Sequence, residues 1–253
     1  MNKDKIQAEQ YSFPYHYLLE IKNNRLSFKK FIYGFEYFSY LALIKKRIIK
    51  LKPKSIIDIG CGDGKLIYEL CRNKDFYKSV NSIVGIDKDK KAISFANALN
   101  EGEKIKFISE NIINLESKSF DVGILMEVIE HFTDKDLKEL IDKIGELVSI
   151  GGFLFVSVPS KNQKLQTKHY RHYDKTDLIE LFKDKFESEN FFFLCHETLI
   201  NKIIKKMYLV SDLLGFNYFK KNLFSLLKRS YFYTDESKCL HIVAIFRRTK
   251  ERL

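Results

Sequence analysis

The chain has 253 residues, of which 45% are hydrophobic and 30% charged. This length suits one large domain or a domain with an addition, and the composition excludes collagen-like, disordered and disulfide-scaffold proteins. No apolar run approaches the ~18 residues that cross a bilayer, and the polar first ten residues lack the apolar core of a signal peptide. The four cysteines form no CxxC pair, so we expect a reduced, cytoplasmic protein.

The net charge of +11 is unevenly distributed along the chain. Residues 55–197 carry 20 Lys and Arg against 25 Asp and Glu, whereas residues 1–54 carry 12 against 4 and residues 198–238 carry 8 against 3. Basic flanks attract anionic partners at long range, and nucleic acid, anionic lipid and phosphorylated substrates all qualify. Solvated faces of a Lys-rich chain explain the same count, because a count does not locate a patch.

The spacing of apolar residues predicts alternating strands and helices. The first helix is expected over 32–50, and the strand Ser55–Ile59 follows it and ends in a glycine cluster. Further strands are expected at 82–86, 104–109, 120–126, 153–158, 191–195 and 240–246. Helices are expected at 64–72, after Asp89, from Thr133 to the Gly151-Gly152 pair, and from Asp174 or Thr176. This order indicates an α/β fold with a doubly wound, mostly parallel seven-stranded sheet and helices on both faces.

Residues 197–238 interrupt this alternation before the last strand. Apolar residues recur there at helical spacing over 199–214 and again over 219–231, which predicts two amphipathic helices. The expected organisation is therefore an N-terminal arm and helix over 1–53, followed by a main domain over 54–253 that carries a helical insertion at 197–238.

The most informative segment is Asp58-Ile-Gly60-Cys-Gly62-Asp-Gly64, between the first strand of the sheet and its helix. Glycines permit positive φ and let a ligand approach the backbone closely. The pattern is GxGxG, whereas a dinucleotide site has GxGxxG. A carboxylate at Asp58 opposes a diphosphate but suits a cation or an ammonium group. Asp87 closes the second strand, where an acid can accept both hydroxyls of a ribose.

This loop, Asp87 and the strand at 120–126 resemble class I S-adenosylmethionine (SAM)-dependent methyltransferases over residues 54–196. The resemblance implies that SAM is the cofactor, with its amino group near Asp58 and its ribose held by Asp87. The residues assigned to the cofactor site are Asp58, Gly60, Cys61, Gly62, Gly64, Asp87, Lys88 and Met126, together with the adenine contact. In the family a polar residue after the third strand binds the adenine amine. Asn111 takes that place by alignment, and Glu110 takes it if the register differs by one.

Glu127, Glu130 and His131 follow the fourth strand, and in a helical turn residues three or four apart share a face. They are expected beside the SAM sulfonium. There they orient the loop or contact the cofactor, act as a general base, or bind a metal. No metal is assigned. We expect catalysis to involve Glu127, with His131 or His169 as the base.

The loop at 168–174 precedes a helix at the same edge of the sheet. His169 or His172 can take a proton from a hydroxyl at neutral pH, and Arg171 can pair with a phosphate or carboxylate.

Two families of methyltransferases share parts of this pattern. Glu127, Glu130, His131 and His169 resemble the two-Glu, two-His metal site of small-RNA 3′-end 2′-O-methyltransferases. The run His169–Asp174 resembles ubiquinone-biosynthesis and sugar- or glycan-modifying methyltransferases, and we favour this second group. The expected acceptor is thus a hydroxyl of a small molecule, a sugar or a lipid-linked glycan. The alternatives are a metal-dependent RNA ribose methyltransferase and a SAM-binding or assembly protein without catalysis.

The N-terminal arm and the insertion are expected to choose the acceptor. Tyr11, Phe13, Pro14, Tyr15, His16 and Tyr17 are expected to form a lid or an acceptor wall. The insertion at 197–238 is expected to cover the site, and its lysines favour weak contact with an anionic membrane, peripheral to its inner face. Nucleic acid is a less favoured partner. The oligomeric state stays open.

Overall fold

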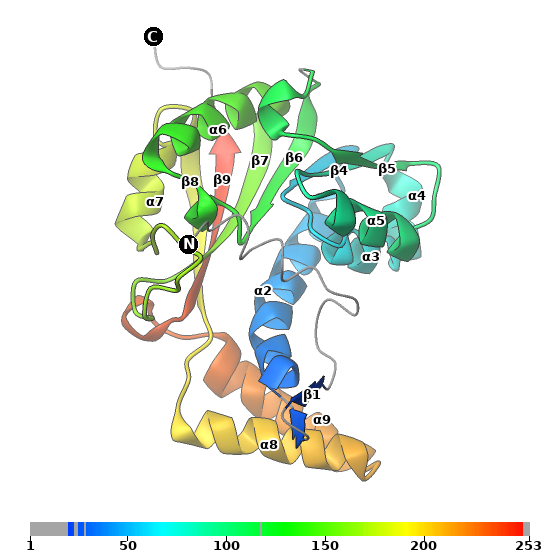
Figure 1. Cartoon of the computed structure of the whole chain (residues 1–253), viewed down its shortest axis with the longest axis vertical. Helices are drawn as coiled ribbons and strands as arrows, with labels where there is room; N and C mark the ends of the chain where they lie inside the picture. The colour runs from blue at the N-terminus through cyan, green and yellow to red at the C-terminus, as the bar shows by residue number, and fades with distance from the viewer. Residues whose placement is uncertain (1–19, 23–24, 28, 117, 250–253) are drawn as a thin grey trace.

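The computed structural model describes residues 20–22, 25–27, 29–116 and 118–249 (Figure 1). Its centre is a seven-stranded sheet with the order β5-β4-β3-β6-β7-β9-β8. The strands are β3 (Ser55–Ile59), β4 (Ser82–Asp87), β5 (Ile105–Ser109), β6 (Phe120–Met126), β7 (Val148–Pro159), β8 (Phe186–Leu194) and β9 (His241–Arg248). Strand β9 is antiparallel to β7 and β8, and the pairs on the other side of β7 are parallel. The predicted mostly parallel α/β sheet is confirmed.

Helices cover both faces of this sheet. The helices described are α2 (Lys29–Leu51), α3 (Lys65–Cys71), α4 (Lys74–Ser79), α5 (Lys90–Leu99), α6 (Asp134–Leu147), α7 (Lys175–Phe182), α8 (Leu199–Leu213) and α9 (Asn217–Leu227). One buried cluster joins α6 and α7 to the sheet, and a second joins α2 and α3 to it. In β3, Ile57 belongs to the first cluster and Ile56 to the second, because successive side chains of a strand point to opposite faces. A small sheet of β1 (Glu20–Lys22) and β2 (Arg25–Ser27) precedes α2.

Several helix starts follow from local sequence. Asp89 accepts the backbone N–H groups of Lys91 and Ala92 and caps α5, as predicted. Asp174 caps α7 in a reciprocal capping box with Asp177. Short turns η1 (Ile112–Asn114), η2 (Ile129–His131), η3 (Lys228–Phe232) and η4 (Glu236–Lys238) complete the described elements.

Differences from the prediction include those at β7, β8 and α4. The helix expected to reach the Gly151-Gly152 pair ends at Leu147, and β7 already begins at Val148, which pairs with Phe120. The strand expected from Phe191 begins at Phe186. Its first half is polar and lies at the edge of the sheet, so it lacks the apolar pattern on which the prediction depends. Helix α4 was not predicted, since six residues are too few to show a period.

The carboxyl ends of the parallel strands meet at one edge of the sheet. Asp58 in β3 lies beside Gly85 in β4 and Ile124 in β6. The glycine loop, Asp87 and the segment after Met126 therefore lie side by side, at the edge where open α/β sheets bind ligands. The lid predicted from the aromatic residues of 11–17 lies outside the described residues.

Candidate functional site

The loop after β3 requires glycine at two positions, for the same two reasons. Gly60 and Gly64 both have left-handed backbone, with φ of +71° and +72°. A Cβ at Gly60 would lie 2.6 Å from a methyl carbon of Val128, and one at Gly64 would lie 2.7 Å from the side-chain nitrogen of Asn100. Any larger residue would thus be strained and would also collide. The loop therefore presents bare backbone to the edge of the sheet.

Asp87 ties this loop to the next strand. Its Oδ2 accepts the N–H of Gly62 at 3.0 Å, and its Oδ1 accepts the N–H of Asp89 at 2.9 Å. Burial raises the pKa of this carboxyl. Each carboxylate oxygen has a second lone pair, so the pair of oxygens can still accept hydroxyl hydrogens. The neighbouring Cys61 is buried, whereas Lys88 is exposed.

Asp58 is a buried acid, and one of its carboxyl oxygens lacks a hydrogen-bond partner among the described residues. Its side chain is 1% exposed, and this oxygen is Oδ2. Burial raises its pKa to about 8, and the charges of Asp87 and Asp63 add to this rise. A buried carboxylate needs a proton or a cation. An ammonium group that entered beside the glycine loop would supply that cation, so this site fits the amino end of SAM.

The two candidates for the adenine contact lie on the surface after β5. Asn111 accepts the N–H of Ile113 through its Oδ1 at 3.3 Å and so caps η1. Glu110 is exposed, and its N–H donates to the carbonyl of Asp87. The side-chain oxygen of Asn111 is thus already engaged in this structure. Which of the two contacts adenine stays a prediction.

Glu127 contacts Ser157 and His241. It has φ of +58°, which is strained for a residue other than glycine. Its carboxylate accepts from the hydroxyl of Ser157 at 2.9 Å and from Nδ1 of His241 at 3.3 Å. The opposite nitrogen of His241 lies 2.6 Å from Glu36 on α2. Glu127, which follows β6, is therefore held in a network of four side chains, the others coming from β7, β9 and α2.

Opposite charges hold this network together. Burial by itself would lower the pKa of His241, but the carboxylates of Glu127 and Glu36 raise it well above its usual value. Burial would raise the pKa of Glu127, but the His241 cation lowers it. The sequence analysis missed this arrangement. The one sequence feature that indicates it is a histidine, His241, directly before the apolar run 242–246.

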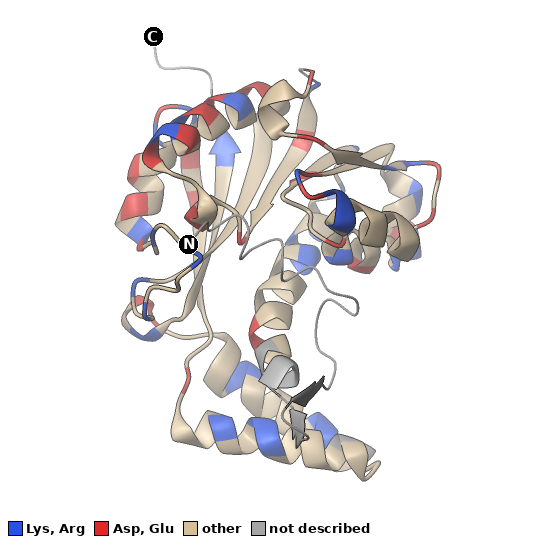
Figure 2. Cartoon of the chain, viewed as in Figure 1, with Lys and Arg blue, Asp and Glu red and all other residues tan. Residues whose placement is uncertain are grey.

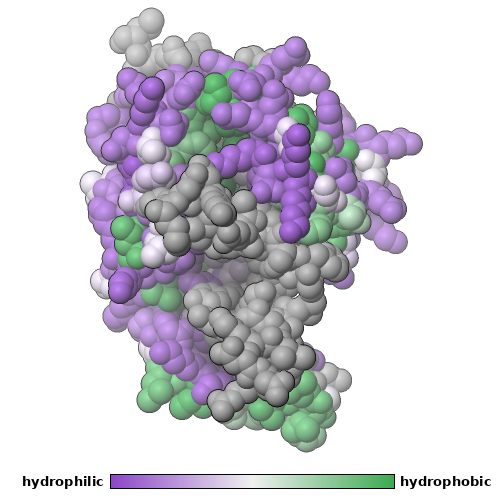
Figure 3. All heavy atoms as spheres, viewed as in Figure 1, coloured by the Kyte–Doolittle hydropathy of each residue, from purple (hydrophilic) through white to green (hydrophobic). Residues whose placement is uncertain are grey.

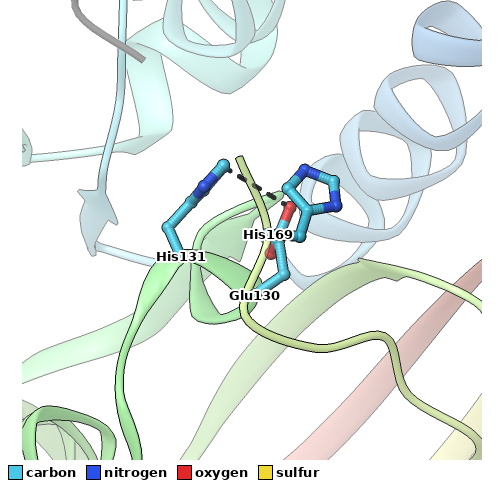
Figure 4. A group of neighbouring side chains, drawn as sticks. All are labelled: Glu130, His131 and His169. Atoms are coloured by element: carbon cyan, nitrogen blue, oxygen red, sulfur yellow. Dashed lines mark ion pairs between the residues drawn. The ribbon is translucent and has the colours of Figure 1, made fainter. Parts of the chain in front are cut away.

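Glu130, His131 and His169 converge, as Figure 4 shows. One nitrogen or oxygen from each lies within 4.8 Å of the others. His131 Nε2 lies 3.9 Å from Glu130 Oε1. Glu130 is completely buried, and neither of its carboxylate oxygens has a hydrogen-bond partner within the described chain. Burial and the charge of Glu127 raise the pKa of Glu130 well above its usual range.

Backbone carbonyls set the tautomers of the histidines. Nδ1 of His131 lies 3.2 Å from the carbonyl oxygen of Lys168, and Nδ1 of His172 lies 3.2 Å from that of Gln163. A carbonyl only accepts, so both rings carry their proton on Nδ1. Nε2 of His172 then accepts, and His169 donates to it from Nδ1 at 2.9 Å. Nε2 of both His131 and His169 is therefore unprotonated.

Both histidines remain neutral at physiological pH. Burial lowers the pKa of His131 to about 4 and that of His169 to about 3. The Lys168 cation lowers both further, and its own pKa is lowered by burial. The sequence analysis gave Lys168 no role. An unprotonated Nε2 atom of an imidazole can accept a proton or bind a metal ion.

Arg171 has a partner within the protein. It forms an ion pair with Asp134 at the start of α6 and donates to the carbonyl of Phe132 at 3.2 Å. The predicted pairing with a substrate phosphate or carboxylate competes with these contacts. In this structure Arg171 links the loop at 168–174 to the start of α6 through its ion pair with Asp134.

A glycine loop after the first parallel strand, an acid after the second and a buried carboxyl whose Oδ2 has no partner among the described residues are features of a class I SAM-dependent methyltransferase. Residues 50–222 match the sequence profile of the methyltransferase domain, and the chain belongs to this family. SAM is the cofactor of the family, and one structural relative contains its product, S-adenosyl-L-homocysteine.

Relatives named "Ubiquinone biosynthesis O-methyltransferase" share part of the sequence. The protein from Pelagibacter ubique (strain HTCC1062) is 32% identical over 134 residues, which are 48% of this chain and 52% of that protein. The protein from Chelativorans sp. (strain BNC1) is 34% identical over 113 residues, or 43% of this chain and 42% of that protein. The chain therefore matches about half the length of these relatives.

Solved structures share the fold at lower identity. The N-methyltransferase NodS from Bradyrhizobium japonicum WM9, in complex with S-adenosyl-L-homocysteine, is 14% identical with a TM-score of 0.57. The match covers 85% of this chain and 88% of NodS. The methyltransferase domain of bacterial CtHen1-C is 17% identical with a TM-score of 0.57, and the match covers 84% of this chain and 98% of that domain.

Proposed function

We propose that the chain transfers the methyl group of SAM to a hydroxyl of a small molecule, a sugar or a lipid-linked glycan. The observation that carries this proposal is the pair of unprotonated Nε2 atoms on His131 and His169 at the carboxyl edge of the sheet. A hydroxyl must lose its proton as it attacks, and a neutral imidazole can accept that proton. The O-methyltransferase names of the sequence relatives support the same acceptor atom.

The residues of this chain divide the work between binding and proton transfer. When bound, SAM supplies a methyl carbon that its sulfonium activates. Asp58 binds the amino group, Asp87 accepts the ribose hydroxyls, and the backbone at 60–64 allows close approach. Alignment of this kind contributes about 7–11 kcal/mol to lowering a barrier. His131 or His169 then accepts the hydroxyl proton on Nε2, while the backbone carbonyls and His172 keep that nitrogen unprotonated.

Removing the base is expected to slow turnover without weakening cofactor binding. We expect His131→Ala or His169→Ala to lower kcat by roughly 10²–10⁴ on the acceptor, which is the usual contribution of a general base. The acceptor is found by mass spectrometry of co-purified ligand, followed by a screen of hydroxyl compounds with labelled SAM. Calorimetry should show unchanged SAM affinity in both variants.

His196→Ala is the matched control, because this histidine lies in the β8–α8 connection outside the cluster, and we expect it to turn over normally. Normal turnover in both of the first two variants would contradict the assignment of the base. Absence of turnover on every hydroxyl compound would favour a binding protein instead.

A second candidate is a metal-dependent ribose 2′-O-methyltransferase, and the convergence of Glu130, His131 and His169 favours it. A buried carboxylate without a hydrogen bond and two neutral imidazoles are a donor set that suits a divalent transition metal. In this case Nε2 would bind the metal, and Glu127 would have to leave Ser157 and His241 to join it.

Chelation separates the two candidates. If the histidines act as bases, we expect EDTA treatment to leave turnover unchanged. Loss of turnover on EDTA, recovery with Mn²⁺, and loss of Mn²⁺ binding in Glu130→Gln would favour the metal-dependent reaction. Methylation of the 3′-terminal ribose of a short RNA is the activity to assay in that case. The basic flanks of the chain are compatible with such a substrate.

A further inference from the structure

The helical pair α8 and α9 packs against α2 through only part of its surface. The ring of Tyr208 in α8 meets Phe35 in α2 edge-on, at 5.6 Å between centroids. Leu223 and Leu227 of α9 are buried on the same side. The side-chain nitrogen of Asn201 donates to the carbonyl oxygens before α8 and after α9, which fixes the base of the pair. Figure 1 shows the pair beyond α2, far from α6.

The outward face of this pair is apolar. Positions 199, 203, 207, 210 and 214 recur at helical spacing and are all exposed, on the side of α8 away from Tyr208. The exposed apolar residues are Leu199, Ile200, Ile203, Met207, Val210, Leu213, Leu214, Phe216, Tyr218, Phe219 and Leu226. Figure 3 shows hydrophobic residues in green at the lower end of the molecule, over α8 and α9. An exposed apolar surface of this extent marks an interaction site.

The charge around this face is mostly positive. Residues 199–233 contain seven Lys and Arg and a single acid, Asp212. Lys205 is buried and pairs with Glu197, whereas Lys202, Lys206, Lys221, Lys228 and Arg229 are exposed. Figure 2 shows blue segments along α8 and α9. Lys202 and Lys206 lie one helical turn apart and line a depression of about 300 Å³ with Leu199, Ile203 and the Lys205–Glu197 ion pair.

We propose that this face, α8 together with α9 and the turn between them, docks on the surface of an anionic lipid bilayer. Apolar side chains then enter the boundary of the acyl chains, and the lysines reach up to the lipid phosphates. A second copy of the chain suits this face less well, because a symmetric contact would bring the two sets of cations together. None of the described helices is long and apolar enough to span a membrane, so the pair lies on the surface. This inference does not rest on the proposed reaction.

The test is co-sedimentation of the full chain with lipid vesicles. We expect binding to phosphatidylcholine vesicles that contain phosphatidylglycerol, and little binding to phosphatidylcholine alone. Raising the salt concentration should weaken the binding, since salt screens exposed charges. No sedimentation with the anionic vesicles would overturn the proposal, and so would equal binding to both kinds of vesicle.

Charge variants test the role of the lysines. Lys202→Gln with Lys206→Gln should lower the partition coefficient by roughly fivefold for each charge removed. The matched control is Lys135→Gln with Lys138→Gln on α6, which removes the same charge from exposed positions at the far end of the molecule. An equal loss of binding in the control would overturn the proposal, because only net charge would then matter.

Apolar variants test the contact itself. Leu214→Ser with Phe216→Ser changes exposed residues at the turn between the helices and should abolish binding to the anionic vesicles. Ile150→Ser in β7, where the side chain is 65% exposed, is the control and should bind normally. All variants should bind S-adenosyl-L-homocysteine normally in calorimetry, which keeps this result separate from the cofactor site. A dimer in sedimentation velocity that only Leu214→Ser with Phe216→Ser dissociates, without vesicle binding, would assign the face to a second copy.

Discussion

Replacing Asp58 by Asn is expected to weaken SAM binding by roughly 100-fold, within the range of about 2–5 kcal/mol for losing one partner of a buried charge pair. The variant keeps the size of the side chain but cannot balance the ammonium group. The free protein should be at least as stable as before, because the change removes a buried carboxyl group whose ionisation burial opposes and whose Oδ2 has no partner among the described residues. Calorimetry measures the first effect and thermal unfolding the second.

Asp89→Asn is the matched control for this variant. It makes the same change of charge, and Asn keeps the cap on α5 that Asp89 provides. We expect SAM affinity in this control to match the original protein. Full SAM affinity in Asp58→Asn would show that the pocket beside the glycine loop does not hold the amino group.

The same carboxyl makes cofactor binding depend on pH. Burial raises the pKa of Asp58 to about 8, so the free protein holds a proton there at pH 7 and must release it when the ammonium group binds. Affinity should therefore rise by about tenfold per pH unit, until the amino group of SAM loses its own proton near pH 8. The stability of the free protein should fall as pH rises from about 4 to 8, because only the unfolded chain is ionised in that range. Asp58→Asn should remove both dependences.

Replacing His241 by Asn is expected to cost about 3–5 kcal/mol of stability, because two carboxylates would be left without their shared cation. For a chain of this length the melting temperature should fall by roughly 10 °C. Glu127 and Glu36 both contact the His241 ring in the structure. Calorimetric unfolding at neutral pH measures the change.

Two further variants define the origin of this loss. Adding Glu36→Gln to His241→Asn should recover part of the stability, since it removes one of the two facing charges. His196→Asn, outside the network, should leave the melting temperature unchanged. An unchanged melting temperature in His241→Asn would mean that the ion pairs of His241 with Glu36 and Glu127 do not contribute to stability.

The pH dependence of stability follows from the two shifted groups. The pKa of Glu127 is lowered, so its contribution is present above about pH 4.5 and is lost as pH falls through the lowered value. The pKa of His241 is raised, so its contribution is present below about pH 6.5 and is lost as pH rises through the raised value. The contribution of the Glu127–His241 pair to stability should therefore be greatest between these two limits, and His241→Asn should reduce both slopes.

Local signals were enough to predict most of the sheet and to place the glycine loop and Asp87 at its carboxyl edge. The strand before the glycines, the acid at the end of the next strand and the cap at Asp89 each depend on a few consecutive residues. The prediction for residues 148–152 was wrong because Gly151 and Gly152 lie inside β7. The pairing of Val148 with Phe120 starts that strand. Local helical periodicity cannot show that partner.

The rest of the site depends on contacts between distant residues. Glu36 and His241 are separated by most of the chain, and only the packing of α2 against the sheet brings them together. The tautomers of His131 and His169 depend on carbonyl oxygens and a ring in the loop after β7. No pattern in the sequence reports where a carbonyl points.

The reversed direction of β9 has a consequence for how this protein can diversify. Leu194, the last residue of β8, is the direct partner of His241, the first residue of β9. The segment between them, 195–240, leaves the sheet and returns to it at this pair of residues. Strand pairing therefore holds the two ends of the segment close together. Evolution can lengthen, shorten or replace this segment at little cost in loop-closure entropy. The register of the sheet and the cofactor site then stay unchanged.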